Sequence, residues 1–460
     1  MILDKKNCYI SICFFSFLIS TSYAQQVRRS PNIIFIMADD LGYGDLGCYG
    51  QKEIKTPRID QLAEMGMRFT DHYSGHTVCR PSRLALFTGK HSGHTAIWAN
   101  APYVLKPEDV TDAELLKQKG YVTGGVGKWA LGNADNEGHP NKNGFDFWMG
   151  YLDQSDAHNY YPMYLWRNYE KVPLPGNVLS DNPMHKGHVS VKQVTYSHDV
   201  MTNEALEFIK RNKDTSFLLH VHWTIPHANN ESGQATGNGM EVPDYGIYKD
   251  KLWPPVEKGF AAMISRKDRD VGRIVDLLKE LKIDKNTVVF VTSDNGPHGE
   301  GGHDYNFFNS NDGLRGYKRD LYEGGIRIPM IVYWPDHIKP HVVTDLVSAF
   351  WDYLPTACTL AEVKPPDNID GISYLPTLLG QLQQKHDYLF WKSTDKGDGT
   401  QVAVRYGKWK GIRMDYTKPI ELYDLSVDKG ETKNEAEHFP EVIKKIESIM
   451  NEADVTRDKK

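Results

Sequence analysis

Short apolar runs rich in β-branched residues recur along this chain, and amphipathic segments separate them. The runs cover 32–37, 217–221, 287–291 and 330–334. Apolar residues recur with the spacing of surface helices in 57–66, 111–120 and 260–281. This alternation is typical of a parallel sheet with helices on both faces. We therefore predict an α/β fold built on a large, mixed but mostly parallel sheet.

The pattern changes near residue 376. Three short runs follow, at 388–391, 401–406 and 408–413, and they have the length and spacing of antiparallel strands joined by turns. A helix is predicted over 440–451. We expect a main α/β domain over 25–375 and a smaller α+β subdomain over 376–460.

The first residues have the pattern of a signal peptide. Lys5 and Lys6 precede an apolar run at 9–19, and Ser22-Tyr23-Ala24 offers small residues for cleavage. The run is shorter than the roughly 20 residues that cross a bilayer. We expect residues 1–24 to be removed and the mature protein to be exported to the periplasm or beyond, without spanning the membrane.

Composition excludes one class of partner. The chain has 460 residues, of which 25% are charged, and its formal net charge is -6. Binding to a phosphate backbone favours a basic excess, which is lacking here. We therefore expect no nucleic acid partner.

The cysteines of the mature chain are few and odd in number. Removal of the signal peptide leaves Cys48, Cys79 and Cys358. This set cannot form a disulfide framework, although an exported protein meets an oxidising compartment. At least one of these cysteines is therefore unpaired or chemically altered.

Polar side chains follow two of the predicted strands. Asp39 and Asp40 come directly after the first strand, and Asp294-Asn295 follows the strand at 287–291. Open α/β sheets place ligands at such strand ends. Adjacent carboxylates repel one another unless a cation lies between them, and hard divalent cations prefer oxygen ligands. Either pair alone is also typical of a helix cap or turn, but together they could supply most of a calcium shell.

A third polar segment begins at Cys79 and reads Cys79-Arg80-Pro81-Ser82-Arg83. Pro81 favours a helix start, which would place Cys79 at the helix N-terminus, where backbone N–H groups stabilise an anion. Arg83 lies four positions on, so a helix would bring it to the same face. The alternative is that Cys79 is a small buried apolar residue.

The segment Cys79-x-Pro81-Ser82-Arg83, followed by Thr88-Gly89, resembles the signature of type I sulfatases, in the branch of bacterial sulfatases that act on sulfated glycans. Other stretches stand in the order found in that family. They are Asp39-Asp40, Gly127-Lys128-Trp129, Thr224-Ile225-Pro226-His227, Ser293-Asp294-Asn295-Gly296, Leu314-Arg315-Gly316-Tyr317-Lys318, 323–329 and 421–425. The resemblance covers essentially the whole mature chain and implies an alkaline phosphatase-like fold.

The resemblance also implies the chemistry. In such sulfatases a maturase oxidises the cysteine, here Cys79, to formylglycine. The hydrated aldehyde attacks sulfur, forms a covalent sulfate ester and expels the alcohol. Loss of the proton from its second hydroxyl then reforms the aldehyde and ejects sulfate, which a serine could not do.

Residue roles follow by the same resemblance. Calcium is expected to be bound by Asp39, Asp40, Asp294, Asn295 and residue 79. Charge around the sulfuryl group is expected to be neutralised by Arg83, Lys128 and Lys318. His227 matches the family histidine near the leaving group and is the candidate general acid.

One position departs from the family. Many relatives have a histidine after Gly-Lys-Trp, whereas this chain has Ala130. Alanine cannot transfer a proton, so another group performs that step, or this branch manages it differently, or turnover is impaired. His76 is the nearest replacement along the sequence.

The segment 151–168 is rich in aromatic and hydrogen-bonding residues that suit the faces and hydroxyls of a sugar. It could equally be a packed loop anchored by its tyrosines. The candidate substrate-binding residues are His158, Asn159 and Tyr160 from this segment, with His303 and Arg315 farther along. The expected substrate is a sulfated glycan carrying galactose or N-acetylgalactosamine sulfate, with the 4-position favoured.

Three alternatives remain open at this point. A phosphodiesterase or phosphonate hydrolase of the same superfamily would prefer phosphodiesters to sulfates. A catalytically silent glycan-binding protein is suggested only by Ala130. A cysteine hydrolase using Cys79 as a thiolate with His227 would survive removal of calcium and leaves the aspartate pairs unexplained.

Overall fold

The computed structural model describes residues 29–185, 187–396 and 399–455. The predicted signal peptide lies outside these ranges. Within them, no helix combines the length and the apolar character that crossing a bilayer requires.

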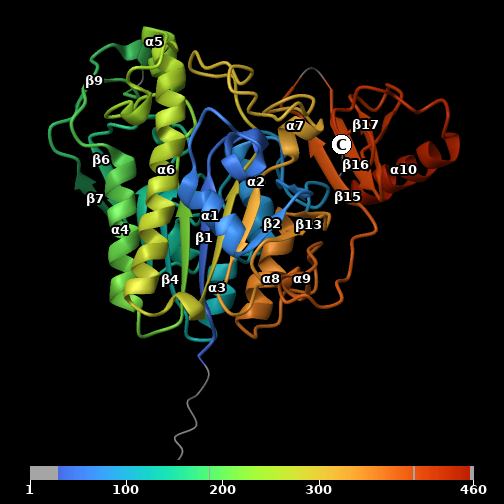
Figure 1. Ribbon diagram of the computed structural model, residues 1–460, viewed down its shortest axis with the longest axis horizontal. Helices are drawn as coiled ribbons and strands as arrows, with labels where there is room; N and C mark the ends of the chain where they lie inside the picture. The colour runs from blue at the N-terminus through green and yellow to red at the C-terminus, as the bar shows by residue number, and fades with distance from the viewer. Residues whose placement is uncertain (1–28, 186, 397–398, 456–460) are drawn as a thin grey trace, which may run out of the picture.

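The described part of the chain is built around a ten-stranded sheet with the order β13-β2-β12-β11-β1-β10-β4-β5-β6-β7 (Figure 1). In that order the strands are Val342–Thr344, Met67–Phe69, Met330–Tyr333, Thr287–Ser293, Asn32–Ala38, Phe217–His222, Val122–Lys128, Phe147–Tyr151, Tyr164–Arg167 and Glu170–Pro173. The five strands from β11 to β5 pair in parallel, whereas β12, β6 and β7 pair antiparallel. The prediction of a mixed, mostly parallel sheet is confirmed.

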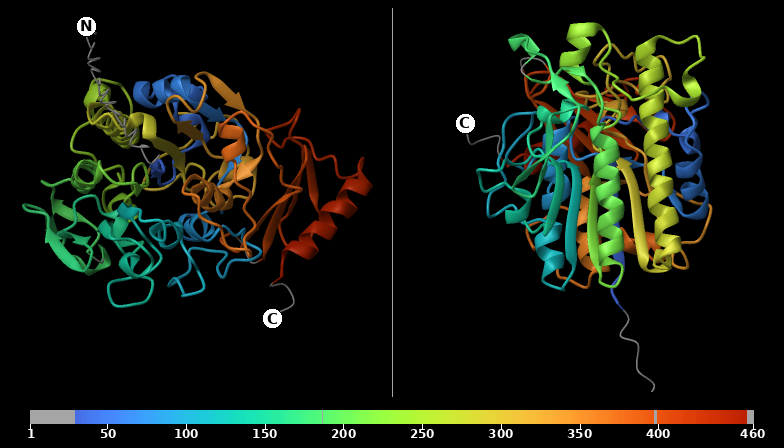
Figure 2. Two further views of the ribbon diagram at one scale, coloured as in Figure 1. Left: turned by 90° about the horizontal axis from the view of Figure 1, so that it is seen from below. Right: turned by 90° about the vertical axis from the view of Figure 1, so that its left-hand side faces the viewer.

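Helices cover both faces of this sheet (Figure 2). One face carries α1 (Pro57–Met65), α4 (Ser197–Asn212) and α6 (Pro255–Glu280), and the other carries α2 (Cys79–Thr88), α3 (Asp112–Lys117) and α8 (Tyr353–Leu360). Strand β1 serves both cores: Ile34 and Ile36 pack on the first face, and Ile33 and Phe35 on the second. A central strand must be apolar on both sides for this reason.

Strand β4 was missed by the sequence analysis because it contains three glycines, which disfavour strands. The structure shows why they are needed. A Cβ on Gly124 would lie 2.4 Å from a ring carbon of Phe208, and one on Gly125 would lie 2.3 Å from the Trp148 ring. Large rings fill the space next to this strand, so the packing overrides the local propensity.

The ends of several elements differ from the predictions. Helix α6 begins at Pro255 rather than at residue 260, because proline is tolerated in the first turn. Helix α3 ends at Lys117 rather than at 120, and Gly120 follows in a left-handed conformation at φ 79°. These differences leave the order of the elements unchanged.

The C-terminal subdomain is an antiparallel sheet of four strands covered by one helix. The strands, in sheet order, are β15 (Leu389–Ser393), β16 (Gln401–Tyr406), β17 (Trp409–Arg413) and β18 (Glu421–Asp424), and the helix is α10 (Pro440–Ala453). Strand β18 was not predicted, since its four residues give little periodicity. Phe390 packs with Ile446 of α10, whereas Trp391 faces Tyr73 of the main domain. The α+β prediction is confirmed, and the boundary near 376 stays a prediction.

Buried charges fasten this subdomain to the main domain. The ammonium of Lys410, on β17, lies 2.8 Å from Glu323 Oε1 and 3.0 Å from Glu431 Oε1. Glu323 begins the short helix α7 (Glu323–Ile326) and also accepts a hydrogen bond of 2.6 Å from Arg327 Nε. The side chains of Lys410, Glu323 and Glu431 are fully buried. Burial raises the pKa of Glu431 to about 7 although Lys410 lowers it.

We predict that Lys410→Met lowers the free energy of unfolding by about 3–5 kcal/mol, because it removes the cation that Glu323 and Glu431 share and leaves only Arg327, which contacts Glu323 alone, to compensate them. Lys408→Met is the matched control, since its ion pair with Asp424 is half exposed and should contribute about 0–1 kcal/mol. Denaturant unfolding followed by tryptophan fluorescence measures both. Equal losses in the two variants would show that the buried triad does not hold the domains together.

Candidate active site

Two acidic segments meet because the strands that precede them are neighbours. β1 and β11 pair in parallel up to Ala38 opposite Ser293, so the residues that follow lie at the same edge. Asn295 Nδ2 donates to Asp40 Oδ1 at 2.6 Å, and the Asp40 amide donates to Asp294 Oδ1 at 3.1 Å. Asp40 adopts the left-handed conformation, at φ 65°, which turns the chain at this point. The predicted convergence of the two segments is therefore present.

Cys79 lies against this acidic edge. It is the first residue of α2 and is fully buried. Its Sγ donates to Asp39 Oδ1 at 3.1 Å and lies 4.0 Å from Asp40 Oδ1. Burial and the charge of Asp39 raise the pKa of the Cys79 thiol well above its usual value. A thiol that donates to a carboxylate is a poor thiolate nucleophile, which opposes the cysteine hydrolase alternative.

Three buried cations face the three carboxylates. Lys128 Nζ lies 2.6 Å from Asp39 Oδ2, and Lys318 Nζ lies 2.7 Å from Asp40 Oδ2. Arg83 donates from Nη2 to Asp294 Oδ2 at 2.9 Å and from Nη1 to the Lys128 carbonyl at 2.7 Å. Arg83 is therefore held by the carboxylates and the backbone around it, whereas each lysine has its ammonium on a single carboxylate of the acidic edge.

These charges set the protonation of the carboxyls. Burial alone would raise the pKa of Asp39, but Lys128, His227 and Arg83 more than offset it and hold that pKa well below the usual range. Burial and the neighbouring Asp39 raise the pKa of Asp294 to about 7, although Arg83 lowers it. The three carboxyls are thus matched in number by three cations, and Asp294 is the carboxyl whose negative charge is lost most readily.

The donor set fits a hard divalent cation. Carboxylates of Asp39, Asp40 and Asp294 converge, and Asn295 Oδ1 is buried without a hydrogen-bond partner among the described residues. Ligand atoms of Asp39, Asp40, Cys79 and His227 also lie within 4.8 Å of one another. Several oxygens and an unpaired amide oxygen suit Ca²⁺, which takes oxygen ligands in flexible geometry.

His227 borders the same cluster. Its Nδ1 donates to the Ala228 carbonyl at 2.7 Å, so its Nε2 is the atom that faces the site, 3.2 Å from Lys318 Nζ and 3.5 Å from Asp40 Oδ2. Burial and the charge of Lys318 lower the pKa of His227 to about 3. The ring of His158 stacks on it, with centroids 4.8 Å apart.

The other candidate substrate residues lie farther from the cluster. Tyr160 is buried and its hydroxyl donates to the Thr224 and His227 carbonyls, and Asn159 accepts from the Tyr161 amide. His303 is buried, 2.7 Å from Glu257 and stacked on Phe260. Arg315 lies over the Tyr322 ring and donates to Tyr423 in the C-terminal subdomain. Tyr160 thus holds the backbone of the loop that carries His227, whereas His303 and Arg315 make the contacts just described with residues outside the catalytic cluster.

Glu300 is a site residue that the sequence analysis missed. Its carboxylate lies 3.2 Å from Lys318 Nζ and forms an ion pair with Arg319. Those cations lower the pKa of Glu300 despite its burial. The available signal was that Glu300 lies five positions after Asn295. Its partners, Lys318 and Arg319, come from a segment about 18 residues farther along, and sequence spacing alone cannot show that the two segments meet.

Ala130 occupies the position where many relatives have histidine. Its backbone is left-handed, at φ 65°, and its carbonyl accepts from Arg80 Nε at 2.8 Å. The proposed replacement, His76, contacts the Lys392 carbonyl through Nε2 at 2.8 Å and Thr77 Oγ1 through Nδ1 at 3.3 Å. Both nitrogens of His76 are thus engaged away from Cys79, so the geometry gives it no role in proton transfer.

Comparisons with known proteins agree with this geometry. The sulfatase family profile matches residues 31–363, and a profile described as N-sulphoglucosamine sulphohydrolase, C-terminal, matches residues 315–456. Human arylsulfatase A is 32% identical over 95% of this chain and 90% of that protein. The N-acetylgalactosamine-6-O-sulfatase of Bacteroides thetaiotaomicron is 30% identical over 92% of this chain and 93% of that protein. A crystal structure of Ps i-CgsB in complex with k-i-k-neocarrahexaose superposes with a TM-score of 0.80 and 27% identity, over 93% of each chain.

The family profile covers most of the chain, and relatives above 30% identity span it almost end to end. The fold is that of the solved sulfatases, as the alkaline phosphatase-like resemblance implied. The chain therefore belongs to the sulfatase family of sulfuric ester hydrolases.

Proposed function

We propose that this protein is an exported, calcium-dependent glycan sulfatase that uses residue 79 as its nucleophile. The observation that carries the proposal is the position of residue 79 at the N-terminus of α2, against the acidic edge on which Asp39 and Asp40 also pair with the ammonium groups of Lys128 and Lys318. A sulfate ester needs a nucleophile at sulfur, positive charge on its oxygens and an acid at the leaving oxygen. All three kinds of group stand together here.

The nucleophile requires a modification of Cys79. A maturase would oxidise its Cβ to the aldehyde of formylglycine, whose hydrate supplies one hydroxyl to attack sulfur and a second to expel sulfate. The thiol itself is held protonated against Asp39, so it offers no competing chemistry. The buried start of α2 gives the anion of this hydrate the helix N–H groups as partners.

Calcium would be held by Asp39, Asp40, Asp294 and Asn295, where it would polarise a sulfate oxygen and favour the ionised nucleophile. Sharing these carboxylates with a divalent cation would weaken their hold on Lys128 and Lys318. The two ammonium groups would then be the positive charges available to sulfate. Arg83, bonded to Asp294 and to the Lys128 carbonyl, keeps the carboxylates in place.

Proton transfer to the leaving alcohol falls to His227. Its Nδ1 is fixed by the Ala228 carbonyl, so only Nε2 can exchange a proton with the leaving oxygen. A neutral imidazole must first receive a proton, and the ammonium of Lys318, 3.2 Å away, is the nearest acid. Glu300 also contacts that ammonium, at 3.2 Å, and its Oε2 lies 4.0 Å from His227 Nε2.

The substrate we propose is a galactose or N-acetylgalactosamine sulfate within a glycan. The segment 151–168 lies beside the catalytic cluster through His158, with Asn159 and Tyr160 shaping its loop. His303 and Arg315 lie outside the residues that contact the catalytic cluster, so they would affect the substrate only indirectly. The name of the Bacteroides relative, an N-acetylgalactosamine-6-O-sulfatase, favours the 6-position, whereas the sequence analysis favoured the 4-position.

The test is sulfate release from paired 4- and 6-sulfates of galactose and N-acetylgalactosamine by protein coexpressed with a maturase. Oxidation of residue 79 is checked by mass, and Cys79→Ala is the inactive control. We expect release from one regioisomer, the 6-sulfate, at least about tenfold faster than from its pair. Faster turnover of an aryl phosphodiester would favour the phosphodiesterase alternative, and no turnover with residue 79 oxidised would favour a silent glycan-binding protein.

We predict that Lys318→Ala lowers kcat by about 10²–10³-fold, because its ammonium meets charge that develops only in the transition state. Lys444→Ala, an exposed lysine on α10, is the control and should leave kcat unchanged. Steady-state kinetics on the preferred regioisomer separates kcat from KM. A rise in KM alone would mean that Lys318 only binds the ground state.

We predict that dialysis against EGTA abolishes turnover and lowers the melting temperature, and that Ca²⁺ restores both. Three buried carboxylates that lose a shared cation repel one another, so the folded state loses stability as well as activity. Calorimetry and metal analysis measure the effect. Full activity in protein shown to hold no metal would remove calcium from the mechanism.

A further inference from the structure

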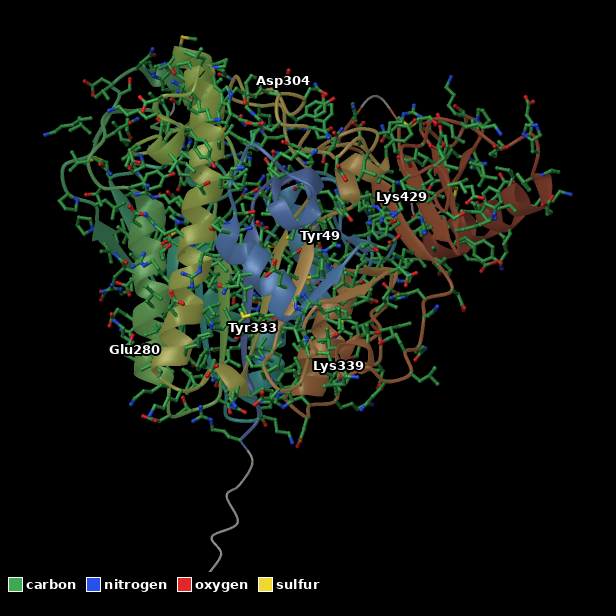
Figure 3. All side chains as sticks on the ribbon, viewed as in Figure 1. Tyr49, Glu280, Asp304, Tyr333, Lys339 and Lys429 are labelled. Atoms are coloured by element: carbon green, nitrogen blue, oxygen red, sulfur yellow. The ribbon has the colours of Figure 1, made fainter. Side chains whose placement is uncertain are left out.

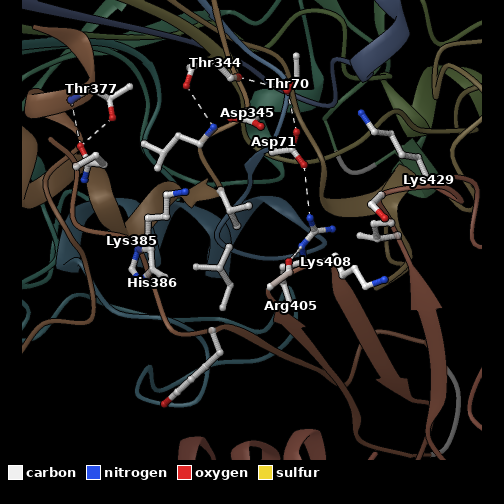
Figure 4. A pocket seen from close by; sticks show the side chains of 18 residues that line it. Thr70, Asp71, Thr344, Asp345, Thr377, Lys385, His386, Arg405, Lys408 and Lys429 are labelled. Atoms are coloured by element: carbon white, nitrogen blue, oxygen red, sulfur yellow. Dashed lines mark hydrogen bonds and ion pairs between the residues drawn. The ribbon is translucent and has the colours of Figure 1, made fainter. Parts of the chain in front are cut away.

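A cavity lies where the C-terminal subdomain meets the main domain. This interdomain cleft has a volume of about 610 Å³, within the range of about 300–1,000 Å³ typical of small-molecule sites. Its walls come from segments 70–71, 344–347, 377–389, 405–408 and 425–429 (Figure 4). None of the residues of the catalytic cluster lines it, so it is a separate site.

Positive charge dominates the walls of the interdomain cleft. Its basic side chains are Lys385, His386, Arg405, Lys408 and Lys429, against the acidic Asp71 and Asp345. Lys385 and His386 stand on one wall, and Arg405, Lys408 and Lys429 on the opposite wall (Figure 4). Lys429 also marks the junction between the two domains in Figure 3. Cations on two facing walls surround an anion placed between them.

Two of these lysines have no competing partner. Lys385 and Lys429 are exposed, and within the described ranges neither forms an ion pair. The net charge of the chain is -6, so a cluster of basic side chains runs against the overall balance. A local excess of charge of one sign at a cleft concentrates ligands that carry the opposite charge.

Arg405 adds a buried group that lacks an acceptor. Its side chain is only 8% exposed, its Nε donates to the Gly407 carbonyl at 2.9 Å, and its nearest carboxylate, Asp71, is 3.7 Å from Nη2. Its Nη1 has no hydrogen-bond partner among the described residues. Leaving a buried guanidinium N–H unpaired is costly, and an anionic ligand in the cleft would offset this cost.

The remaining lining suits a sugar. Tyr388 offers a half-buried ring, and the hydroxyls of Thr377 and Ser426, which donate to Gln383 and Asp424, can still accept hydrogen bonds from a sugar. Leu346 and Val347 provide a small apolar floor. Aromatic, hydroxyl and cationic groups together match a saccharide that carries sulfate groups, rather than a purely apolar ligand.

We propose that the interdomain cleft binds a second sulfated segment of the glycan chain whose sulfate ester is hydrolysed at residue 79. This inference rests on the proposed function for the choice of ligand. Its consequence is that the enzyme holds a polymer at two places, so a long substrate gains affinity that a monosaccharide sulfate does not.

The first test measures binding without turnover. The full chain carrying Cys79→Ala is titrated calorimetrically with a chondroitin sulfate hexasaccharide, before and after adding Lys385→Gln and Lys429→Gln. We expect affinity about tenfold weaker in the cleft variant, and no change with the charge-matched Lys444→Gln/Lys445→Gln on α10. Unchanged affinity in the cleft variant would overturn the proposal, as would equal binding of unsulfated chondroitin or tighter binding of a hexaglutamate peptide.

The second test uses catalysis with Cys79 intact and matured. The cleft variant should keep kcat and KM for a monosaccharide sulfate, and its KM for the polymer should rise about tenfold. Equal KM values for the polymer in both proteins would contradict the proposal. Failure of the proposed function has a different signature, because the monosaccharide sulfate would then not be hydrolysed by either protein, while the titration still reports on the cleft.

Discussion

The active site depends on a balance of buried charge at the carboxyl ends of β1 and β11. Three carboxylates lie close together out of water, and Arg83, Lys128 and Lys318 compensate them. Buried like charges at such distances could not persist without these partners or a metal. In this structure the two lysines pair with carboxylates, and under the proposed function a divalent cation at these carboxylates would free them for an anionic substrate.

The rest of the fold serves to bring these groups together. Parallel pairing of β1 with β11 aligns the two acidic segments, and β4 delivers Lys128 from two strands away. That strand can pass between the Phe208 and Trp148 rings only because it carries glycine at 124 and 125. The apolar packing on both faces of the sheet thus fixes the positions of charges at its edge, which flexible loops alone could not hold.

Sequence reasoning found what local patterns encode. The sheet, the closing subdomain and the meeting of Asp39-Asp40 with Asp294-Asn295 followed from apolar runs and from what comes directly after them. It missed β4, because packing decided that strand, and Glu300, because its cations come from a distant segment. The roles of the site residues stay predictions. Contacts such as that of Arg315 with Tyr423 arise from the docking of the subdomain, which no local pattern describes.

The alanine at position 130 leaves charge stabilisation and proton transfer to side chains from other positions. Its carbonyl is occupied by Arg80, and no imidazole can project from this position. Among the described residues, the rings that border the cluster include His227, His158 stacked on it, and His298, which has a ring nitrogen within 4.8 Å of a carboxylate oxygen of Asp40. His158 Nδ1 donates to Glu231 at 3.1 Å. Under the proposed function, the His227 and Lys318 pair would supply both charge stabilisation and proton transfer, on the side of the cluster where His158 of the 151–168 segment lies. Alanine at position 130 is then compatible with the proposed turnover, because these two groups provide the proton and the positive charge without an imidazole from that position.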